Sequence, residues 1–245
     1  MCTLIVMTRM FEGVPLLVAD NRDERLSRPA EGPSWWPEPK EPRIFAPRDL
    51  EAGGTWLGLN DVGLFAGLTN RHTSSYDPGR GSRGHIVSGA LKFARAAQAA
   101  AAIAAMPPED TNPFHLVLAD REDAHLVWHD GAAVHHKALT PGWYVVTERS
   151  LGAAPSARED FVRAQMPELV TGGAPKLEAL AGLLSHQRGA GFDDVRVELP
   201  ERDYGTRASL VVQYGAQLED VDFWWRDGGF IANDPSAEFL RPLEA

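Results

Sequence analysis

Short apolar runs open the chain. The first two, Met1–Thr8 and Val14–Ala19, are separated by Phe11-Glu12-Gly13, which can turn the chain. Together they predict an antiparallel hairpin that turns around residues 10–12. Because both runs are nearly continuous and do not alternate with polar residues, we expect both faces of this sheet to be covered.

The rest of the chain follows the order strands, helix, strands, helices, strands. Residues 29–48 carry six prolines and Trp35-Trp36, which is typical of a surface loop. Further strands are expected within Gly53–Asn60 and over Gly63–Asn70, Phe114–Ala119, His125–His129, Ala133–Ala138, Trp143–Thr147, Ala208–Tyr214, Val221–Arg226 and Gly229–Asn233. Helices are expected from Arg83, after a Ser82 cap, to Ala105, and over Ser156–Leu169 and Pro175–Gln187. This order indicates mainly antiparallel sheets with helices packed outside, in one domain over residues 1–245.

Composition narrows the class of protein. The chain has 245 residues, 44% of them hydrophobic, and a net charge of −10. The hydrophobic share argues against disorder, and the negative charge argues against non-specific nucleic-acid binding. No apolar run reaches the length of a membrane span, and the first residues lack the features of a secretory signal. We therefore expect a cytoplasmic protein, while its oligomeric state stays open.

Cys2 is the single cysteine of the chain, so an intramolecular disulfide and a cysteine-based zinc cluster are both excluded. If Met1 is removed, Cys2 carries both a thiol and a free α-amine. An amine beside its own nucleophile can act as the base that activates it. The simpler interpretation is a small hydrophobic side chain at the start of a strand.

The predicted hairpin brings a polar cluster, residues 20–24, to this cysteine. A turn around residues 10–12 sets Cys2 opposite residues 19–21, with Asn21 and Asp23 on one face of the strand and Arg22 and Glu24 on the other. An aspartate stabilises a nearby ammonium group, and an arginine lowers the pKa of a nearby thiol. The alternative is a solvated strand end with surface salt bridges.

Several strings, in this order along the chain, resemble the NRDE family, the bacterial relatives of the transport and Golgi organisation protein two. They are Cys2 with its strand, Asn21-Arg22-Asp23-Glu24, Gly53–Asn60, Leu68-Thr69-Asn70, Ser82-Arg83-Gly84 and Tyr204-Gly205-Thr206-Arg207. The resemblance extends from residue 2 to about residue 226. It implies an N-terminal nucleophile hydrolase-like fold, a four-layer αββα sandwich of two mainly antiparallel sheets. The nearest chemistry is that of cysteine amidases such as bile-salt hydrolases and penicillin V acylases.

The resemblance also implies roles for individual residues. Cys2 matches the nucleophile, Asp23 the aspartate that binds the α-amine, Asn70 an oxyanion-hole asparagine and Arg207 a late active-site arginine. The expected reaction is hydrolysis of an amide in a small molecule through a thioester, without a cofactor. The side chains expected around the substrate are Asn21, Arg22, Trp56, Arg71 and Glu148.

Two departures from the amidase pattern favour a rival class. Asp20 stands where the amidases carry arginine, and Thr147-Glu148 stands where they carry an asparagine. A carboxylate there would repel an oxyanion. The rival hypothesis is a non-catalytic carrier of haem or of an acyl or lipid ligand, as the family's eukaryotic members suggest. The histidines His125, His129 and His135-His136 are interpreted as surface or core residues with no metal set.

Overall fold

The computed structural model describes residues 2–189 and 191–243, and the chain forms two compact units. One unit consists of residues 1–28 and 143–245, and the other of residues 29–142. Over the described residues the protein is of the mixed α+β class, with one antiparallel sheet in each unit. The fold class predicted from the sequence is confirmed, whereas the single domain over residues 1–245 stays a prediction.

The first unit contains the N-terminal hairpin. Its sheet has the strand order β10-β1-β2-β12-β13-β14, and β11 pairs with β12. The elements are β1 (Cys2–Phe11), β2 (Val14–Arg25), β10 (Gly142–Thr147), α3 (Ala157–Leu169), α4 (Leu177–Leu184), β11 (Glu198–Leu199), β12 (Tyr204–Tyr214), β13 (Val221–Asp227) and β14 (Glu238–Leu240), with 3-10 turns at Gly191–Asp193 and Pro200–Arg202.

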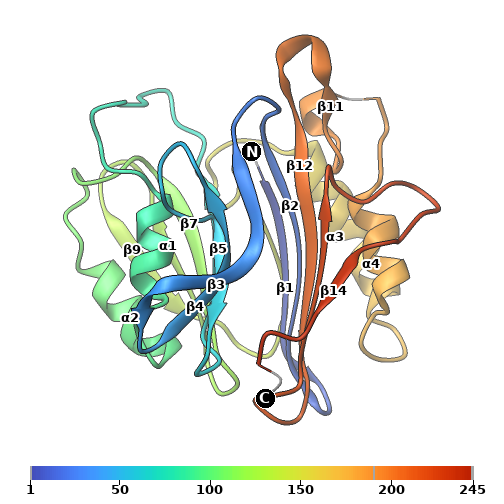
Figure 1. The fold of residues 1–245 in the computed structure, drawn as a ribbon. Helices are drawn as coiled ribbons and strands as arrows, with labels where there is room; N and C mark the ends of the chain where they lie inside the picture. The colour runs from blue at the N-terminus through green and yellow to red at the C-terminus, as the bar shows by residue number, and fades with distance from the viewer. Residues whose placement is uncertain (1, 190, 244–245) are drawn as a thin grey trace. The chain divides into compact units, whose positions relative to one another are not determined.

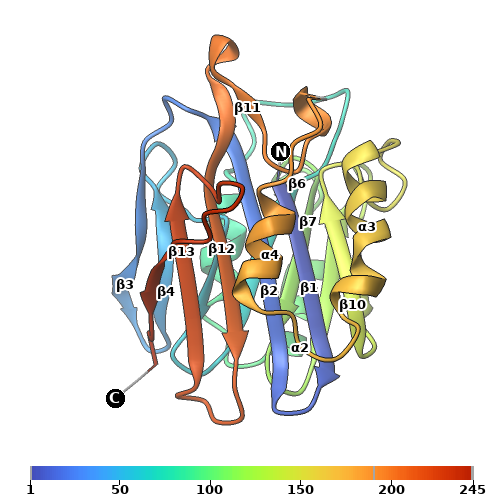
Figure 2. The same ribbon diagram turned by 90° about the vertical axis from the view of Figure 1, so that its right-hand side faces the viewer.

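The helices α3 and α4 cover one face of this sheet, in front of its strands in Figure 2. Ile5, Met7 and Leu17 point to that face and pack against Val162 and Leu180 of the two helices. The residues between them in β1 and β2 point to the opposite face and are buried as well. The expectation that both faces of the hairpin are covered is confirmed.

The second unit is a meander of adjacent strands with two helices. Its strand order is β3-β4-β5-β6-β7-β8-β9, the order of the chain itself. The strands are β3 (Ala30–Lys40), β4 (Arg43–Asp49), β5 (Leu57–Asn60), β6 (Phe65–Asn70), β7 (Phe114–Ala119), β8 (Ala124–His129) and β9 (Val134–Ala138), and the helices are α1 (Gly84–Ala90) and α2 (Ala96–Ala104). Both helices, green in Figure 1, pack apolar side chains into the same core as β4, β6, β7 and β8.

The prediction of a loop over residues 29–48 is wrong, because β3 and β4 occupy most of it. β3 is the edge strand of its sheet and pairs on one side only. Pro33, Pro37 and Pro39 have no N–H group to donate, and this costs fewer hydrogen bonds in an edge strand than in a central strand. The pairing is also irregular, with register shifts between Glu31 and Ser34 and again before Lys40. Edge prolines of this kind resemble a loop when only the sequence is read.

The single helix predicted from Arg83 to Ala105 is also wrong. The chain forms α1 and α2 with a break between them. In the break, the side-chain amide of Asn60 donates to the carbonyls of Leu91 and Phe93, at 2.9 and 2.8 Å. These bonds satisfy carbonyls that a continuous helix would have bonded itself. The break between the two helices is therefore stabilised by Asn60, about thirty residues earlier in the chain.

Two smaller predictions also fail. Ser82 makes no side-chain cap to α1, whose N-terminal boundary residue is Arg83. Residues 229–233 form no strand, because Gly228 and Gly229 both have positive φ and curl the chain before the short β14. None of the helices in the described residues has the length and hydropathy that crossing a membrane requires.

The glycines of two predicted motifs meet in the second unit. A Cβ added to Gly54 would lie 2.5 Å from the backbone carbon of Gly84, whose carbonyl accepts from the N–H of Thr55 at 3.3 Å. Glycine at both positions lets the segment before β5 touch the start of α1. These motif residues therefore support packing within the second unit.

We expect Gly54→Ala to destabilise the protein by about 1–3 kcal/mol, since the new methyl group overlaps backbone that cannot rotate away. Gly89→Ala is the matched control, because it lies within α1 and a Cβ there meets nothing within 4 Å. Removing that glycine from a helix should stabilise by about 0.5–1 kcal/mol. Urea unfolding followed by circular dichroism measures both, and equal effects of the two substitutions would contradict the packing argument.

Candidate functional site

Cys2 begins β1 and pairs directly with Arg22 of β2. The predicted partners, residues 19–21, are wrong by one to three positions. Glu12 and Gly13 form a two-residue turn between the paired Phe11 and Val14, and the ladder shifts register between Phe11 and Thr8. The turn lies farther along the chain than predicted, so every partner moves toward the C-terminus. The polar cluster at residues 20–24 still lies beside Cys2.

The two faces of β2 separate its polar residues into two groups. Directly paired residues of antiparallel strands share a face, so Cys2 lies on the face of Arg22 and Asp20. Asn21 and Asp23 lie on the other face, which α3 and α4 cover. The register therefore divides the cluster between the two faces of β2 as predicted.

Arg207 lies in a β-bulge of β12, on the other side of β2 from β1. Thr206 pairs with Asp23 and Ala208 with Arg22, so Arg207 is an extra residue in the ladder. Because Arg207 and Ala208 together oppose Arg22, both are directed to the face that carries Cys2. The bulge therefore directs a second arginine to the face of the thiol.

Asp23 is the most tightly held residue of the cluster. Its Oδ2 accepts from Nη1 of Arg158 at 2.8 Å, and its Oδ1 accepts from the Thr206 hydroxyl at 2.7 Å. Its backbone carbonyl accepts from the Tyr204 hydroxyl at 3.0 Å. The side chains of Asp23 and Arg158 are 0% and 1% exposed. The carboxylate is therefore fixed in position next to the residue that pairs with Cys2.

Arg158 was missed by the sequence analysis, although a signal was present. It lies in the first turn of α3, four residues before Val162 and eight before Met166, and these three are the buried residues of the helix. A charged residue at an apolar position of a helical stripe indicates a buried partner. Here Nη1 of Arg158 also lies 3.4 Å from the Thr3 hydroxyl, and Nη2 donates to the carbonyl of Phe192.

Glu148 extends this buried group of charges. It follows β10, is nearly buried, and places Oε2 3.9 Å from Nη1 of Arg158 and Oε1 3.6 Å from Nε of Arg149. Ser150 and Thr147 hold the turn that carries it, through hydrogen bonds to Glu159 of α3. One arginine thus lies between two carboxylates, Asp23 and Glu148.

Burial dominates the acid–base chemistry of the cluster. It raises the pKa of the Cys2 thiol to about 12, and the charges of Asp20 and Asp23 also act in this direction. It raises the pKa of Asp20 well above the usual value, which Arg22 opposes. Burial also raises the pKa of Asp23, against the opposing effects of Arg158 and the Thr206 hydroxyl. For Arg158, burial acts downward but Asp23 and Glu148 raise its pKa, so it stays charged.

Asn21 has its polar atoms engaged within the protein. Its side-chain nitrogen donates to the carbonyls of Leu184 and Val195 at 2.8 and 2.9 Å, and its oxygen accepts from the Ser209 hydroxyl. It thereby ties the end of α4 to β2. The contact of Asn21 with substrate stays a prediction.

Trp56, Asn70 and Arg71 lie in the second unit. Asn70 ends β6, and Arg71 follows it with Nη1 2.7 Å from Nε2 of His115. Because a guanidinium can only donate, Nε2 of His115 accepts and Nδ1 carries the hydrogen, facing the Thr69 hydroxyl at 3.2 Å. This chain of bonds anchors the end of β6. The functions predicted for the three residues stay predictions.

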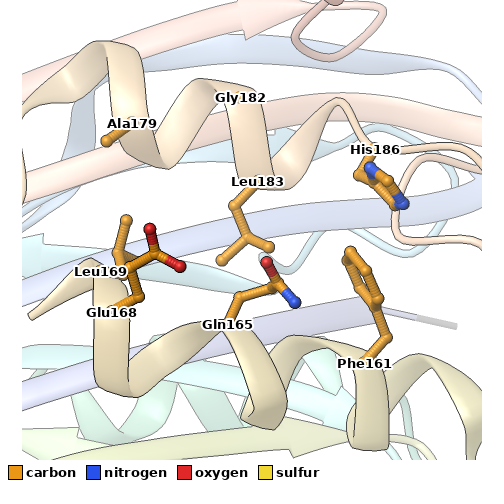
Figure 3. Close-up of a pocket in the computed structure, with 8 residues that line it drawn as sticks. All are labelled: Phe161, Gln165, Glu168, Leu169, Ala179, Gly182, Leu183 and His186. Carbon is orange, nitrogen blue, oxygen red and sulfur yellow. The ribbon is translucent and has the colours of Figure 1, made fainter.

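A groove of about 400 Å³ lies between α3 and α4, away from the face of Cys2 (Figure 3). Phe161 and His186 stack at one end of it, with ring centroids 4.2 Å apart. Gln165 and Leu183 lie between the helices, and Glu168 lies toward the other end. None of the predicted site residues lines this groove.

Comparison with known proteins identifies the family of the chain. A profile of the family described as Transport and Golgi organisation 2 matches residues 1–224. The mouse Transport and Golgi organization 2 homolog is 38% identical over 76 residues, which is 30% of this chain and 27% of that protein. The human homolog matches to the same extent. The matched segment therefore spans about a quarter of the length of these relatives.

Solved structures show the same fold. The Caenorhabditis elegans ortholog of N-acylethanolamine-hydrolyzing acid amidase aligns with a TM-score of 0.61 at 13% identity, over 88% of this chain and 97% of that one. Penicillin V acylase from Agrobacterium tumefaciens aligns with a TM-score of 0.59 at 17% identity, over 98% of this chain and 86% of that one. At these identities the likeness shows the N-terminal nucleophile hydrolase-like fold.

Proposed function

This chain belongs to the Transport and Golgi organisation 2 family, and we propose that it hydrolyses an amide bond in a small molecule, with Cys2 as the nucleophile. The observation that carries this proposal is the position of the only thiol, which pairs with Arg22 next to the fixed carboxylate of Asp23. The fold shared with an acid amidase and a penicillin acylase supports the same class of reaction. We propose that it acts in the cytoplasm, where a lone thiol stays reduced.

The reaction begins with removal of Met1, which gives Cys2 a free amine. This amine takes the thiol proton, and the sulfur attacks the amide carbon to form a tetrahedral oxyanion. The leaving amine departs with the proton, and a thioester remains on Cys2. Water then attacks the thioester and releases the acid and the thiol. The buried thiol needs such an adjacent base, since its own pKa of about 12 leaves little thiolate near neutrality.

We assign Asp23 to hold the terminal amine. Support for this role comes from its fixed oxygens and from its place one residue beyond the partner of Cys2. Asn70 is proposed as an oxyanion donor and Arg207 as a cation beside the substrate, the latter supported by the bulge that directs it to the face of Cys2. Arg22, Trp56, Arg71 and Glu148 are proposed to line the substrate site.

Mass spectrometry of the native protein tests the proposal directly. We expect an intact mass without Met1 and, after rapid acid quench with a panel of acyl amides, an added acyl group on the N-terminal peptide. Cys2→Ala should give neither adduct nor turnover, while Ser34→Ala, at an exposed serine, should behave as wild type. A chain that keeps Met1, or turnover that survives in Cys2→Ala, would refute the mechanism.

A second candidate is a non-catalytic carrier of haem or of an acyl or lipid ligand. The observation that favours it is the pair of buried carboxylates Asp20 and Glu148, which would repel an oxyanion formed near them. Titration with haem separates the candidates. A Soret shift that saturates at one haem per chain, without hydrolysis of any amide, supports the carrier.

A further inference from the structure

The histidines of β8 and β9 form a pair that the proposed hydrolase does not use. In the antiparallel register, Val127 pairs with His136 and His125 with Ala138, so His125 and His136 are diagonal neighbours on one face. Nδ1 of His125 lies 3.0 Å from Nε2 of His136. His125 is 8% exposed, whereas His136 is exposed on the edge strand. One imidazole is therefore anchored, and the other is accessible to solutes.

We propose that His125 and His136 together bind a divalent transition-metal ion, with Cu²⁺ preferred over Ni²⁺ and Zn²⁺. Nitrogen ligands lie about 2.0–2.1 Å from such ions, so two imidazoles at a right angle around one ion are about 2.9 Å apart. In a tetrahedral arrangement the same bonds separate them by about 3.3 Å. The two nitrogens are now at a hydrogen-bond distance of 3.0 Å, close to both values, so the preference for Cu²⁺ rests on the general order of affinity of nitrogen ligands for divalent metals.

The apolar neighbours of the pair supply no ligands, but they bring no repelling charge either. On the same face, Leu116, Leu118 and Val127 pack against the small apolar residues of α2, which bring no positive charge to the face. Lys137, next to His136, points to the opposite face of the strand. The net charge of −10 also favours cations over anions near the surface.

Binding requires both rings to rotate until their lone pairs meet at the ion. The imidazoles now share one hydrogen, which moves to the other nitrogen of its own ring when the ion takes its place. Among the described residues no group of three or more histidine, cysteine, aspartate and glutamate side chains could hold a metal. Solvent or a small ligand must therefore complete the coordination of the ion. A site with open positions is suited to an exchangeable ion and not to a purely structural one.

Titration with Cu²⁺ tests the inference, using protein without a histidine tag and in a Cys2→Ser background, since the thiol would itself react with copper. We expect one saturable site, and the electron paramagnetic resonance spectrum of the bound Cu²⁺ should show two nitrogen ligands. His136→Ala should lower the affinity for Cu²⁺ by more than about tenfold, because replacing even a residue that only hydrogen-bonds a metal ligand lowers metal affinity by that factor. Zn²⁺ should bind more weakly than Cu²⁺.

His135→Ala is the matched control, because His135 lies on the opposite face, stacked on Trp128 and bonded to Asp130. It should keep the site. Circular dichroism and thermal unfolding without metal verify that both variants are folded. The absence of a saturable site, or equal affinity in His136→Ala and its parent, would overturn the proposal. Equal loss in the two variants would overturn it as well.

Discussion

Replacing Arg158 by methionine is expected to lower the free energy of unfolding by about 3–5 kcal/mol. The substitution keeps most of the length of the side chain but removes the cation 2.8 Å from Asp23. Both side chains are almost fully buried, so the carboxylate would be left buried without its counter-charge. Glu148, 3.9 Å from the same guanidinium, would lose one of its two arginine partners. Urea unfolding at neutral pH measures the loss.

The control is Arg149→Met, nine residues earlier in the chain, because Arg149 lies beside the same buried carboxylate, Glu148. Arg149 is 29% exposed and lies 3.6 Å from Glu148 and 3.3 Å from Asp193, so its removal should cost less than about 1 kcal/mol. Combining Arg158→Met with Asp23→Asn should recover part of the loss, since no unpaired charge then remains at Asp23. Comparable effects of Arg158→Met and Arg149→Met would show that burial of the Asp23 pair has no energetic consequence.

Alkylation of Cys2 by iodoacetamide is expected to be about a thousandfold slower in the folded chain that retains Met1 than in urea. Burial raises the pKa of the thiol from 9.0 to about 12, and only the thiolate reacts. Each pKa unit changes the thiolate fraction about tenfold well below the pKa. The rate is measured at pH 8 by mass spectrometry of the N-terminal peptide, with Cys2→Ser as the unreactive control.

The raised pKa of Cys2 also determines whether stability rises or falls with pH. Between pH 9 and pH 12 the unfolded chain releases the thiol proton while the folded chain keeps it, so stability falls as the pH rises through this window. The loss should be absent in Cys2→Ser. Equal alkylation rates in folded and unfolded protein would mean that Cys2 is not held in the buried position described here. That result would also remove the need for an adjacent base in the proposed mechanism.

The strands were predicted well wherever their apolar side chains repeat locally. The strands β7, β8 and β13 lie within one residue of the predicted ranges, whereas β1 and β2 form the predicted hairpin but end three and six residues later than predicted. The segments that failed depend on distant contacts. Asn60 bonds the break between α1 and α2, and β3 is a strand because it lies along β4, in spite of its prolines.

For the candidate site, the order of motifs was enough to select Cys2, Asp23 and Arg207 and to predict the family and the fold. The choice of residues rested on the resemblance to the family, and their roles stay predictions, whereas the family and the fold are confirmed. Which residue faces Cys2 depended on a register shift near Thr8, and a shift of one residue reverses the face of every side chain. The cation beside Asp23 comes from a helix more than a hundred residues later, and the acid–base state of the whole cluster follows from its burial. Desolvation and long-range pairing arise only once the chain has folded, and for that reason the tertiary structure alone decided them.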